Sequence, residues 1–414
     1  MSAEAIIITI GNELTSGLIA DTNSAEMSLM LAELGIVTIR HETVDDHVER
    51  IAAALRRAAG EAAVVLVAGG LGPTEDDVTR EALALVLGRS LELHAESLRQ
   101  IEALFAARGY VMSPANRRQA LCPAGAEPLA NPVGTAPGIA ASVGGARVFV
   151  VPGVPREMRH LMGLHVLPRL ADAAGGEAVV YRTAHAFGAG ESVIGEKLAD
   201  LMGRSSNPLV GTTACDGIIA VRITARGADR AGAAALAERT LEEVRRRLGP
   251  IVFGIDDQTL AGAVVEALGA RRQTMAVAES CTGGWLGKLL VDVPGASGVL
   301  AGGVISYANA VKEALLGVEP DLLAACGAVS EPVAAAMAQG VRRRLGVDYA
   351  LAITGVAGPA GGTAAKPVGL VYTALAWAEG QTVRRHQFPG DRQGIRLRAA
   401  LTALNMLRLH LMES

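Results

Sequence analysis

The stretch "VVLVAGGLGPTEDDVTREAL", residues 64–83, determines the fold class that we predict for the first 170 residues. A short apolar run is followed by a glycine-rich loop and then by a helical sequence that we expect over residues 76–87. "AIIITIG" likewise precedes a predicted helix over residues 23–34, and "ARVFVVPG" precedes "VPREMRHLM". Repeated strand–loop–helix units predict a parallel sheet with helices on both faces and ligands at the carboxyl ends of its strands.

Two further units follow this one. The next is a small α+β unit, with elements predicted as a strand over 178–187, a helix over 191–202, a two-strand ribbon turning at Cys215-Asp216-Gly217, a helix over 231–248 and a strand over 250–254. From Asp257 a helix leads into the predicted strands "TMAVAES", "GGVISYA", "YALAITG" and "VGLVYTALAW", and the unit closes with the helix "GIRLRAALTALNMLRLHL". We therefore predict an α/β domain over 1–172, a small α+β domain over 176–255 and a second α/β domain over 257–414.

The composition excludes several classes of protein. A formal net charge of -4 provides no basic surface for nucleic acid. No apolar run reaches the length of a membrane span, and no secretory signal is recognisable. The four cysteines are scattered, which argues against a disulfide scaffold or a structural zinc site. We expect a soluble cytoplasmic protein that binds small molecules, and paired α/β domains favour a homodimer.

Lysine is rare in this chain. Of 38 basic residues only four are lysine, namely Lys197, Lys288, Lys312 and Lys366. A guanidinium stays charged, whereas a buried ammonium can lose its proton. Each lysine is therefore a candidate for acid–base chemistry, although chance retention explains any single one as well.

The loop after residues 64–68 permits two interpretations. Thr74 with Asp77 three residues later fits a helix-capping box. Alternatively, the glycine turn binds phosphate at a helix N-terminus, and a divalent cation joins the phosphate to Asp76 and Asp77. Glu13 and the pair Asp45-Asp46 follow other predicted strands and extend the acidic set.

"NPVGTAPG", residues 131–138, is an uncharged turn suited to a nucleotide or a pterin-like ligand. The glycine-rich loop after residues 64–68 has neither the spacing of a Walker loop nor that of a GxGxxG motif.

The stretch "AESCTGGWLGK" places three nucleophile candidates, Ser280, Cys281 and Thr282, at a strand-to-helix turn. Amides of such a turn suit an oxyanion. No histidine occurs between His185 and His386, so a Ser–His–Asp triad is hard to build, and an isolated cysteine is more often a packing residue. Lys312, in "SYANAVKEALLG", is the base of a possible Ser–Lys pair, with a solvated surface lysine as the alternative.

Longer motifs resemble one known family in order along nearly the whole chain. "GNELTSGLIADTNS", "VDDH", "GGLGPTEDDVT", "NPVGTAPG" and "VPGVPREM" resemble the N-terminal domain of the CinA (competence/damage-inducible) family, which is similar in fold to molybdopterin-binding proteins. "AESCTGG", "GGVISYANAVKEALLGV", "GAVSEPVAAAMAQG" and "AITGVAGPAGGTAAKPVG" resemble the family's C-terminal amidase domain. The middle unit matches the small KH-type domain in position but has no basic GxxG loop, so RNA binding is not implied.

For the C-terminal domain the resemblance implies deamidation of nicotinamide mononucleotide (NMN) to nicotinic acid mononucleotide and ammonia, without a cofactor. It implies Ser280 as nucleophile, Lys312 as general base and Tyr307 as the residue that orients or tunes this lysine. It also implies that Thr354 lies near the attacked carbonyl or near the Ser–Lys pair. Arg392 best matches the family's phosphate-binding arginine, with Arg396 as the alternative. The remaining predicted substrate contacts are Glu279, Cys281, Thr282, Gly283, Gly284, Asn309 and Gly355.

For the N-terminal domain the resemblance implies hydrolysis of ADP-ribose to AMP and ribose 5-phosphate with a divalent cation such as Mg²⁺. Asp76, Asp77, Glu13 and Asp45 are the predicted metal ligands. The predicted nucleotide contacts are Gly70, Gly72, Thr74, Asn131, Gly134 and Thr135. The alternative is a non-catalytic module that binds a nucleotide or a pterin in a competence-related protein.

Overall fold

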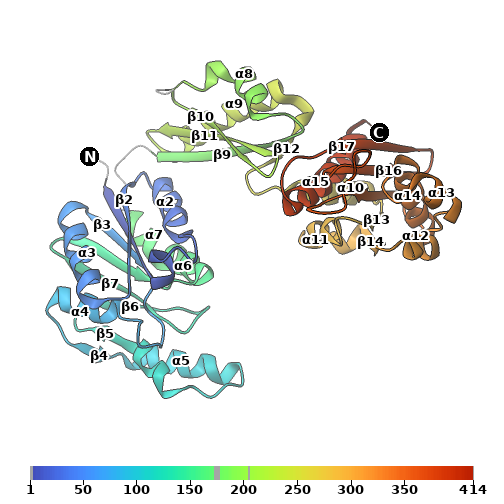
Figure 1. Cartoon of the computed structure of the whole chain (residues 1–414). Helices are drawn as coiled ribbons and strands as arrows, with labels where there is room; N and C mark the ends of the chain where they lie inside the picture. Colours follow the sequence, from blue (N-terminus) through green and yellow to red (C-terminus); the bar gives the residue numbers. More distant parts are fainter. Residues whose placement is uncertain (1–2, 172–177, 204–205, 414) are drawn as a thin grey trace. The chain divides into compact units, whose positions relative to one another are not determined.

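The computed structural model describes residues 3–171, 178–203 and 206–413. Its architecture is a mixed α/β domain, a small α+β domain and a second α/β domain, as predicted (Figure 1). By packing, the chain forms two compact units, one reaching to Val180 and including Ala225–Leu236, the other comprising Tyr181–Thr224 and the chain from Ala237 onwards. The predicted boundary at residues 172 and 176 lies outside the described residues.

The N-terminal domain is built on a six-stranded sheet of order β2-β1-β3-β8-β7-β6. Its strands, with those of a separate β4–β5 pair, are β1 (Glu4–Ile10), β2 (Val37–Val44), β3 (Val64–Ala68), β4 (Leu91–Leu93), β5 (Leu121–Pro123), β6 (Glu127–Leu129), β7 (Gly138–Val143) and β8 (Ala146–Val151). Its helices are α1 (Asn12–Thr15), α2 (Asn23–Glu33), α3 (Val48–Glu61), α4 (Thr79–Leu87), α5 (Ala95–Ala107), α6 (Pro155–Leu161) and α7 (Leu167–Leu170), with a 3-10 turn over Pro114–Ala120 and a π turn over Met162–Val166. Strands β2, β1, β3 and β8 are parallel to one another. β7 pairs antiparallel with β8, and β6 pairs antiparallel with β7.

Two apolar cores cover the two faces of this sheet. Leu55 of α3 and Leu83 of α4 belong to one core, and Met27 of α2 and Leu161 of α6 belong to the other. Strands buried on both faces read as continuous apolar runs, which is why the stretch opening at Val64 was informative. The parallel part of the sheet brings the carboxyl ends of β1, β3 and β8 to one edge.

One predicted helix boundary is wrong. Helix α4 begins at Thr79 rather than at residue 76, and Thr74 is not its N-cap, because Val78 occupies that position without a side-chain cap. The carboxylate of Asp77 instead accepts hydrogen bonds from the loop that precedes the helix. The acidic residues therefore lie in the loop and not in the first helical turn.

The middle domain has a four-stranded sheet of order β10-β11-β9-β12. Its elements are β9 (Ala178–Phe187), α8 (Glu191–Lys197), a 3-10 turn over Ala199–Leu201, β10 (Leu209–Cys215), β11 (Ile218–Gly227), α9 (Arg230–Leu248), a 3-10 turn over Gly249–Ile251 and β12 (Val252–Ile255). The predicted ribbon is confirmed, and its turn uses positive φ at Asp216 (54°) and Gly217 (85°). Asp and Gly suit such a two-residue hairpin turn.

The C-terminal domain has a five-stranded sheet of order β14-β13-β15-β16-β17. Its strands are β13 (Met275–Glu279), β14 (Leu300–Ile305), β15 (Tyr349–Gly355), β16 (Leu370–Ala376) and β17 (Gln381–Gln387). Its helices are α10 (Leu260–Arg271), α11 (Trp285–Val291), α12 (Asn309–Leu316), α13 (Pro320–Cys326), α14 (Glu331–Leu345) and α15 (Arg392–Glu413), with a 3-10 turn over Ala296–Gly298. β14, β13 and β15 are parallel, so their carboxyl ends converge at one edge.

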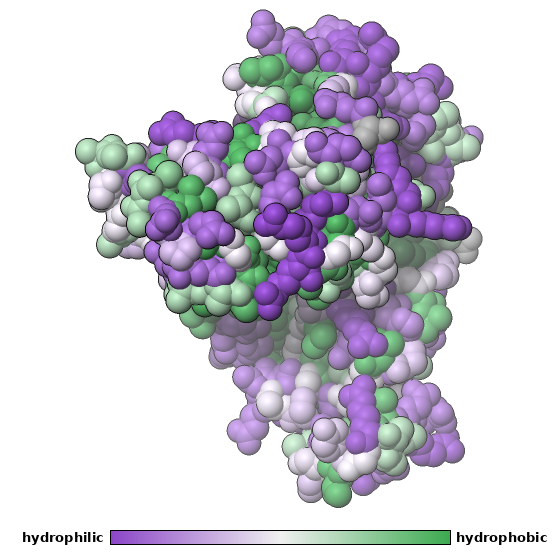
Figure 2. All heavy atoms as spheres, turned by 90° about the vertical axis from the view of Figure 1, so that its right-hand side faces the viewer, coloured by the Kyte–Doolittle hydropathy of each residue, from purple (hydrophilic) through white to green (hydrophobic). Residues whose placement is uncertain are grey.

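The surface is predominantly polar on the face shown in Figure 2, with smaller hydrophobic areas between hydrophilic side chains. Within the described residues, no helix combines the length and the apolar character that crossing a membrane requires.

The two apolar cores of the C-terminal domain lie on opposite faces of its sheet, one with α10, α11 and α15 and the other with α13 and α14.

Candidate functional site

The strongest candidate site lies where β13 and β14 end. Ser280 directly follows β13, and Ser306 directly follows β14. Lys312 lies in the second turn of α12, the helix that follows β14. β13 and β14 are parallel neighbours, and α12 starts shortly after the end of β14. This arrangement brings together Ser280 and Lys312, which are 32 residues apart in the sequence.

Lys312 and Ser280 are in direct contact. Nζ of Lys312 lies 3.3 Å from Oγ of Ser280, 2.5 Å from the carbonyl oxygen of Ser306 and 3.4 Å from that of Tyr307. A neutral amine has two N–H donors and one lone pair, which matches two carbonyl acceptors and one hydroxyl donor. The three contacts fit such a neutral amine, and they fit equally an ammonium that donates to all three oxygens, so burial decides between the two forms.

Burial favours this uncharged form. The Lys312 side chain is 0% exposed. Desolvation lowers the pKa of Lys312, and the nearby Cys281 thiol acts in the opposite direction as a smaller effect. Among the described residues, no carboxylate forms an ion pair with this amine. The arrangement is that of a general base able to remove a proton from Ser280.

Glu279 organises the turn that follows Ser280. Its carboxylate accepts hydrogen bonds from the amides of Gly284 (2.9 Å), Leu286 (3.1 Å) and Gly287 (2.8 Å), and the residue is 1% exposed. The acid thus caps the N-terminal end of α11, where unpaired amides otherwise remain. The predicted substrate contact through Glu279 is corrected, because its oxygens are already used by the turn.

The turn leaves two amides for an oxyanion. Gly283 (φ 59°) and Gly284 (φ 96°) adopt left-handed backbone conformations that favour glycine. The Gly283 amide donates to the carbonyl of Ser280, and the Gly284 amide donates to Glu279. Among the amides from Cys281 to Gly284, those of Cys281 and Thr282 have no hydrogen-bond acceptor in another residue of the part of the chain that the structure describes.

The three adjacent side chains of the turn have different surroundings. Burial raises the pKa of the Cys281 thiol to about 12, so it is protonated at neutral pH. Thr282 is fully buried. Ser280 is the one in contact with a base, and it retains 9% exposure.

The structure places four other predicted residues, whose proposed roles stay predictions. Tyr307 contacts Lys312 through its backbone carbonyl, whereas its ring is 66% exposed and its hydroxyl lies 3.5 Å from Arg392. The fully buried Thr354 donates its hydroxyl to the carbonyl of Ala328 (2.8 Å). Asn309 is exposed at the start of α12. Gly355 is the last residue of β15.

Two arginines line a cavity beside this turn. Arg392 and Arg396 are one helical turn apart on α15, and both line an open cavity of about 860 Å³. Arg392 donates to the carbonyl of Gly358 (2.6 Å). Arg396 donates to the carbonyl of Thr282 (2.6 Å) and lies 5.0 Å from the ring centroid of Trp285. Arg396 therefore also supports the turn that follows Ser280.

Sequence reasoning missed two contributors to this site. Ser306 provides its carbonyl to Lys312, and no side-chain pattern reports a backbone acceptor. Trp285 forms a wall of the arginine-lined cavity. It had a usable signal, because it is one of only two tryptophans and directly follows the glycine pair.

A second cavity, of about 540 Å³, lies at the carboxyl ends of β1, β3 and β8. Glycine-turn residues and acids line it, including Gly70, Gly72, Thr74, Glu13 and Asp76. Thr135 lines it as well, held by Gln119 at 3.1 Å. Sequence positions that are far apart thus meet at the predicted sheet edge.

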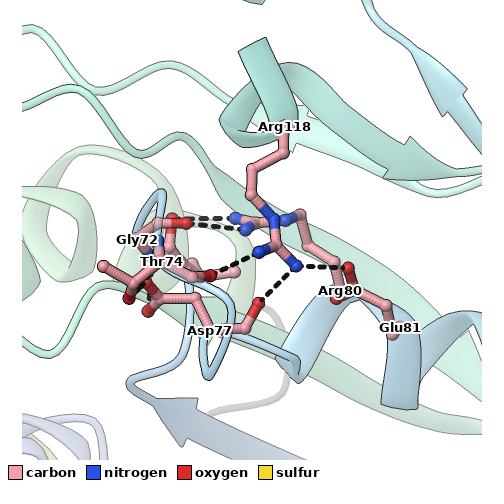
Figure 3. A network of polar contacts seen from close by, with 7 residues as sticks. Gly72, Thr74, Asp77, Arg80, Glu81 and Arg118 are labelled. Carbon is pink, nitrogen blue, oxygen red and sulfur yellow. Dashed lines mark hydrogen bonds and ion pairs between the residues drawn. The ribbon is translucent and has the colours of Figure 1, made fainter. Parts of the chain in front are cut away.

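A network of polar contacts holds the glycine turn of this cavity (Figure 3). Arg80 is 1% exposed and donates to the carbonyls of Leu71 (2.7 Å) and Gly72 (2.8 Å). Arg118 contacts the carbonyl of Thr74 and the carboxylate of Glu81. Two guanidinium groups therefore hold the turn through its carbonyl oxygens.

Asp77 completes this network through the amide groups of the turn. Its carboxylate accepts from the amides of Gly72 (2.7 Å) and Thr74 (2.9 Å) and from the Thr74 hydroxyl. These are the amides that a phosphate-binding turn would offer to its ligand. Asp77 also lines the cavity, and its carboxylate has acceptor sites beyond those that the turn uses, so its predicted role as a metal ligand stays a prediction.

The acidic residues that line this cavity differ from the predicted ones at one position. Asp45 forms an ion pair with Arg50, whereas its neighbour Asp46 lines the cavity. Burial raises the pKa of Asp46; the Asn12 amide opposes this, and the charges of Glu13, Asp76 and Asp77 raise the pKa further. Among the described residues, no three acidic, histidine or cysteine side chains converge as a ready metal-binding group.

Two residues of the uncharged turn serve its structure. Asn131 is buried, and its amide donates to the carbonyl of Ala136 (2.9 Å) and to Glu157 (2.7 Å). A Cβ at Gly134 would meet Glu157 at 2.0 Å, so this glycine permits the acid to approach. The predicted ligand contacts at Asn131 and Gly134 are corrected to roles in the packing of the turn.

Comparison with known proteins agrees with this architecture. Family models match residues 6–172 ("Probable molybdopterin binding domain"), 181–254 ("Damage-inducible protein CinA KH domain") and 257–411 ("CinA C-terminal domain"). The chain is 46% identical over 407 residues to a CinA-like protein of Anaeromyxobacter sp. (strain Fw109-5) and 45% identical over 410 residues to one of Synechococcus sp. (strain RCC307), covering 98% of both chains in each case.

A solved structure is also similar. The competence/damage inducible protein CihA from Agrobacterium tumefaciens matches with 37% identity and a TM-score of 0.36, over 37% of this chain and 93% of that one. Fold and matches together define a three-domain α/β protein in which a molybdopterin-binding-type domain and a KH-type domain precede a CinA C-terminal domain. The chain belongs to the CinA family of competence/damage-inducible proteins.

Proposed function

We propose that the C-terminal domain is an amide hydrolase that converts NMN to nicotinic acid mononucleotide and ammonia. The observation that carries this proposal is the contact of 3.3 Å between the fully buried Lys312 amine and the Ser280 hydroxyl. A lysine without a carboxylate partner, bound to two carbonyls, is suited to accept a proton. A buried lysine acting only as a structural cation would be expected to have an anionic partner.

In the proposed reaction, the lone pair of Lys312 takes the Ser280 proton as Oγ attacks the carboxamide carbon. The amides of Cys281 and Thr282 donate to the resulting oxyanion, and each well-placed donor is worth roughly 3 kcal/mol in the transition state. The lysine ammonium returns its proton to the departing nitrogen, which leaves as ammonia. Water then attacks the acyl-enzyme while Lys312 again accepts a proton, and the acid and free Ser280 are released.

The cavity beside the turn supports a phosphorylated substrate. Arg392 and Arg396 place two positive charges on one face of α15, and guanidinium groups match the geometry of phosphate oxygens. Arg396 donates to the Thr282 carbonyl and lies against the Trp285 ring, and Arg392 donates to the Gly358 carbonyl. Each guanidinium has five N–H donors, so both arginines retain donors for the phosphate.

The test is ammonia release from NMN by Ser280→Ala and Lys312→Ala, beside wild-type protein. Both variants are expected to lose turnover by at least about a thousandfold, as for removal of a nucleophile or its base. Lys197→Ala, at an exposed lysine of α8, is the matched control and should keep wild-type activity. Near-normal turnover in a folded Ser280→Ala protein would reject the mechanism.

For the N-terminal domain we propose hydrolysis of ADP-ribose to AMP and ribose 5-phosphate with a divalent cation. The cavity of about 540 Å³, with its glycine turn and several carboxylates, favours this second function. Mg²⁺ needs only one or two protein carboxylates when substrate phosphates and water complete its shell, so Asp46 and Asp76 are the residues that would hold it. Bound there, the cation would neutralise charge on the diphosphate.

Release of AMP from ADP-ribose, measured with and without Mg²⁺, tests this proposal. Wild-type protein is expected to act only with the metal, and Asp76→Asn should lose most of the activity. If no metal condition yields AMP although ADP-ribose binds, the domain is instead a nucleotide-binding module.

A further inference from the structure

A third cavity, of about 690 Å³, lies inside the second compact unit and outside both sites described above. It is bounded by strands β10, β11 and β12 of the middle domain and by helices α10, α11 and α15 of the C-terminal domain. Its volume is in the range of sites for small organic ligands. The apolar residues that line it include Ile218, Phe253, Leu260, Leu289, Leu397 and Leu401.

The walls of this cavity are firmly packed. Phe187 and Phe253 of the middle domain belong to the same buried core as Leu404 of α15. Arg408 of α15 is 5% exposed and donates to the carbonyl of Pro250 at 2.5 Å, which joins the 3-10 turn before β12 to this helix. A continuous apolar core therefore joins the elements that form the walls of the cavity, which is open to solvent on one side.

The rim of the cavity is negatively charged. The four carboxylates of Asp216, Asp256, Asp257 and Asp292 contrast with the single guanidinium of Arg222. Ion pairs neutralise two of these acids, since Arg182 pairs with Asp256 and Lys288 pairs with Asp292. Asp216 and Asp257 have no ion pair among the described residues and outnumber Arg222, so the lining has an excess of negative charge.

An aromatic pair adds a flat surface to one wall. The rings of His185 and Phe253 stack with centroids 5.9 Å apart and an interplanar angle of 23°. The His185 ring is held by a contact of 2.6 Å between Nε2 and the carbonyl of Asp256. An aromatic face beside carboxylates attracts planar cations, both through stacking and through the ring quadrupole.

We propose that this cavity binds a planar organic cation, with its aromatic body against Phe253 and the leucines and its charge toward Asp216 and Asp257. Apolar walls supply most of the binding energy, and the charge of the rim selects the sign of the ligand. Leu289 and Leu397 lie on α11 and α15, which at their N-terminal ends carry the nucleophile turn and the two arginines. A ligand here would thus contact both helices that hold the proposed amidase site.

Cys215 offers a readout at the site itself. It lines the cavity and is exposed, whereas Cys122 and Cys281 are buried. A bound ligand should shield this thiol from iodoacetamide, and mass spectrometry of the peptide that contains Cys215 measures the rate of its alkylation.

The experiment titrates the full-length protein with berberine, a planar aromatic cation whose fluorescence rises in apolar surroundings, and in parallel with the anionic probe 1-anilinonaphthalene-8-sulfonate. We expect saturable berberine binding, slower alkylation of Cys215 in its presence, and weaker binding of the anion. The double variant Asp216→Asn, Asp257→Asn should weaken berberine binding by about fivefold, as expected for two partly exposed charges. Thr213→Trp, which fills the mouth with a bulky side chain, should abolish it.

The matched control is Glu266→Gln with Glu379→Gln, two exposed acids of the C-terminal domain outside the cavity, which should leave berberine binding unchanged. Any of three results would overturn the proposal: no saturable berberine binding, no protection of Cys215, or equal affinity for the anionic probe. Binding that survives in both the double variant and Thr213→Trp would overturn it as well.

Discussion

Replacement of Lys312 by arginine separates the positive charge of this side chain from its ability to lose a proton. Arginine retains the charge and a similar length, but its guanidinium does not deprotonate in proteins. The lysine is 0% exposed, its Nζ lies 3.3 Å from Ser280 Oγ, and burial lowers its pKa from the ordinary 10.5. If its neutral form is the catalyst, Lys312→Arg removes the base entirely.

The expected magnitude follows from the protonation equilibrium. At the ordinary pKa of 10.5, only about one lysine in a thousand is neutral at pH 7.5. Each unit by which burial lowers the pKa raises this fraction about tenfold, equivalent to 1.36 kcal/mol. General bases contribute about 10²–10⁴-fold to turnover, so Lys312→Arg should lose at least about a thousandfold in kcat.

The assay is kcat/KM for NMN between pH 6 and 10.5. Because the neutral amine is the active form, activity falls as pH drops through the lowered pKa of Lys312. We expect wild-type kcat/KM to rise about tenfold per pH unit in the acid range and to level off below 10.5. Lys197→Arg is the control for a harmless lysine-to-arginine change. A flat wild-type profile, or a Lys312→Arg variant within tenfold of wild type, would refute the assignment.

Three further predictions concern other contacts. Glu279→Ala leaves three amides of the turn without their acceptor, so the free energy of unfolding measured in urea should fall by about 2 kcal/mol and most NMN turnover should be lost. Unchanged values in both assays would contradict the capping role. Arg80→Met removes both donors to the glycine turn, so ADP-ribose affinity in calorimetry should fall about tenfold while NMN turnover stays constant; loss of both activities would point to global unfolding instead. Chelation with EDTA should stop ADP-ribose hydrolysis and spare NMN turnover; inhibition of the amidase would count against a metal-free Ser280–Lys312 mechanism.

Local sequence patterns predicted the elements well and their ends less well. The strand over Ala178–Phe187 and the ribbon turn at Asp216 and Gly217 were readable because β periodicity and turn residues act over a few positions. Helix α4 was predicted to start too early, since Asp77 resembles a capping acid in sequence but binds the preceding loop in space. The same contact gives Asp77 a role in the structure of the loop that the sequence pattern did not indicate.

The sequence alone determined the three-domain α/β organisation and the choice of Ser280 and Lys312, because apolar periodicity, lysine scarcity and long motifs are properties of the chain itself. Only the tertiary structure decided which groups surround that pair. The carbonyl of Ser306, the burial that favours a neutral amine, and the use of Glu279 by backbone amides arise when separate strand ends meet at one sheet edge. Backbone acceptors and desolvation depend on distance in space, which no spacing along a chain specifies.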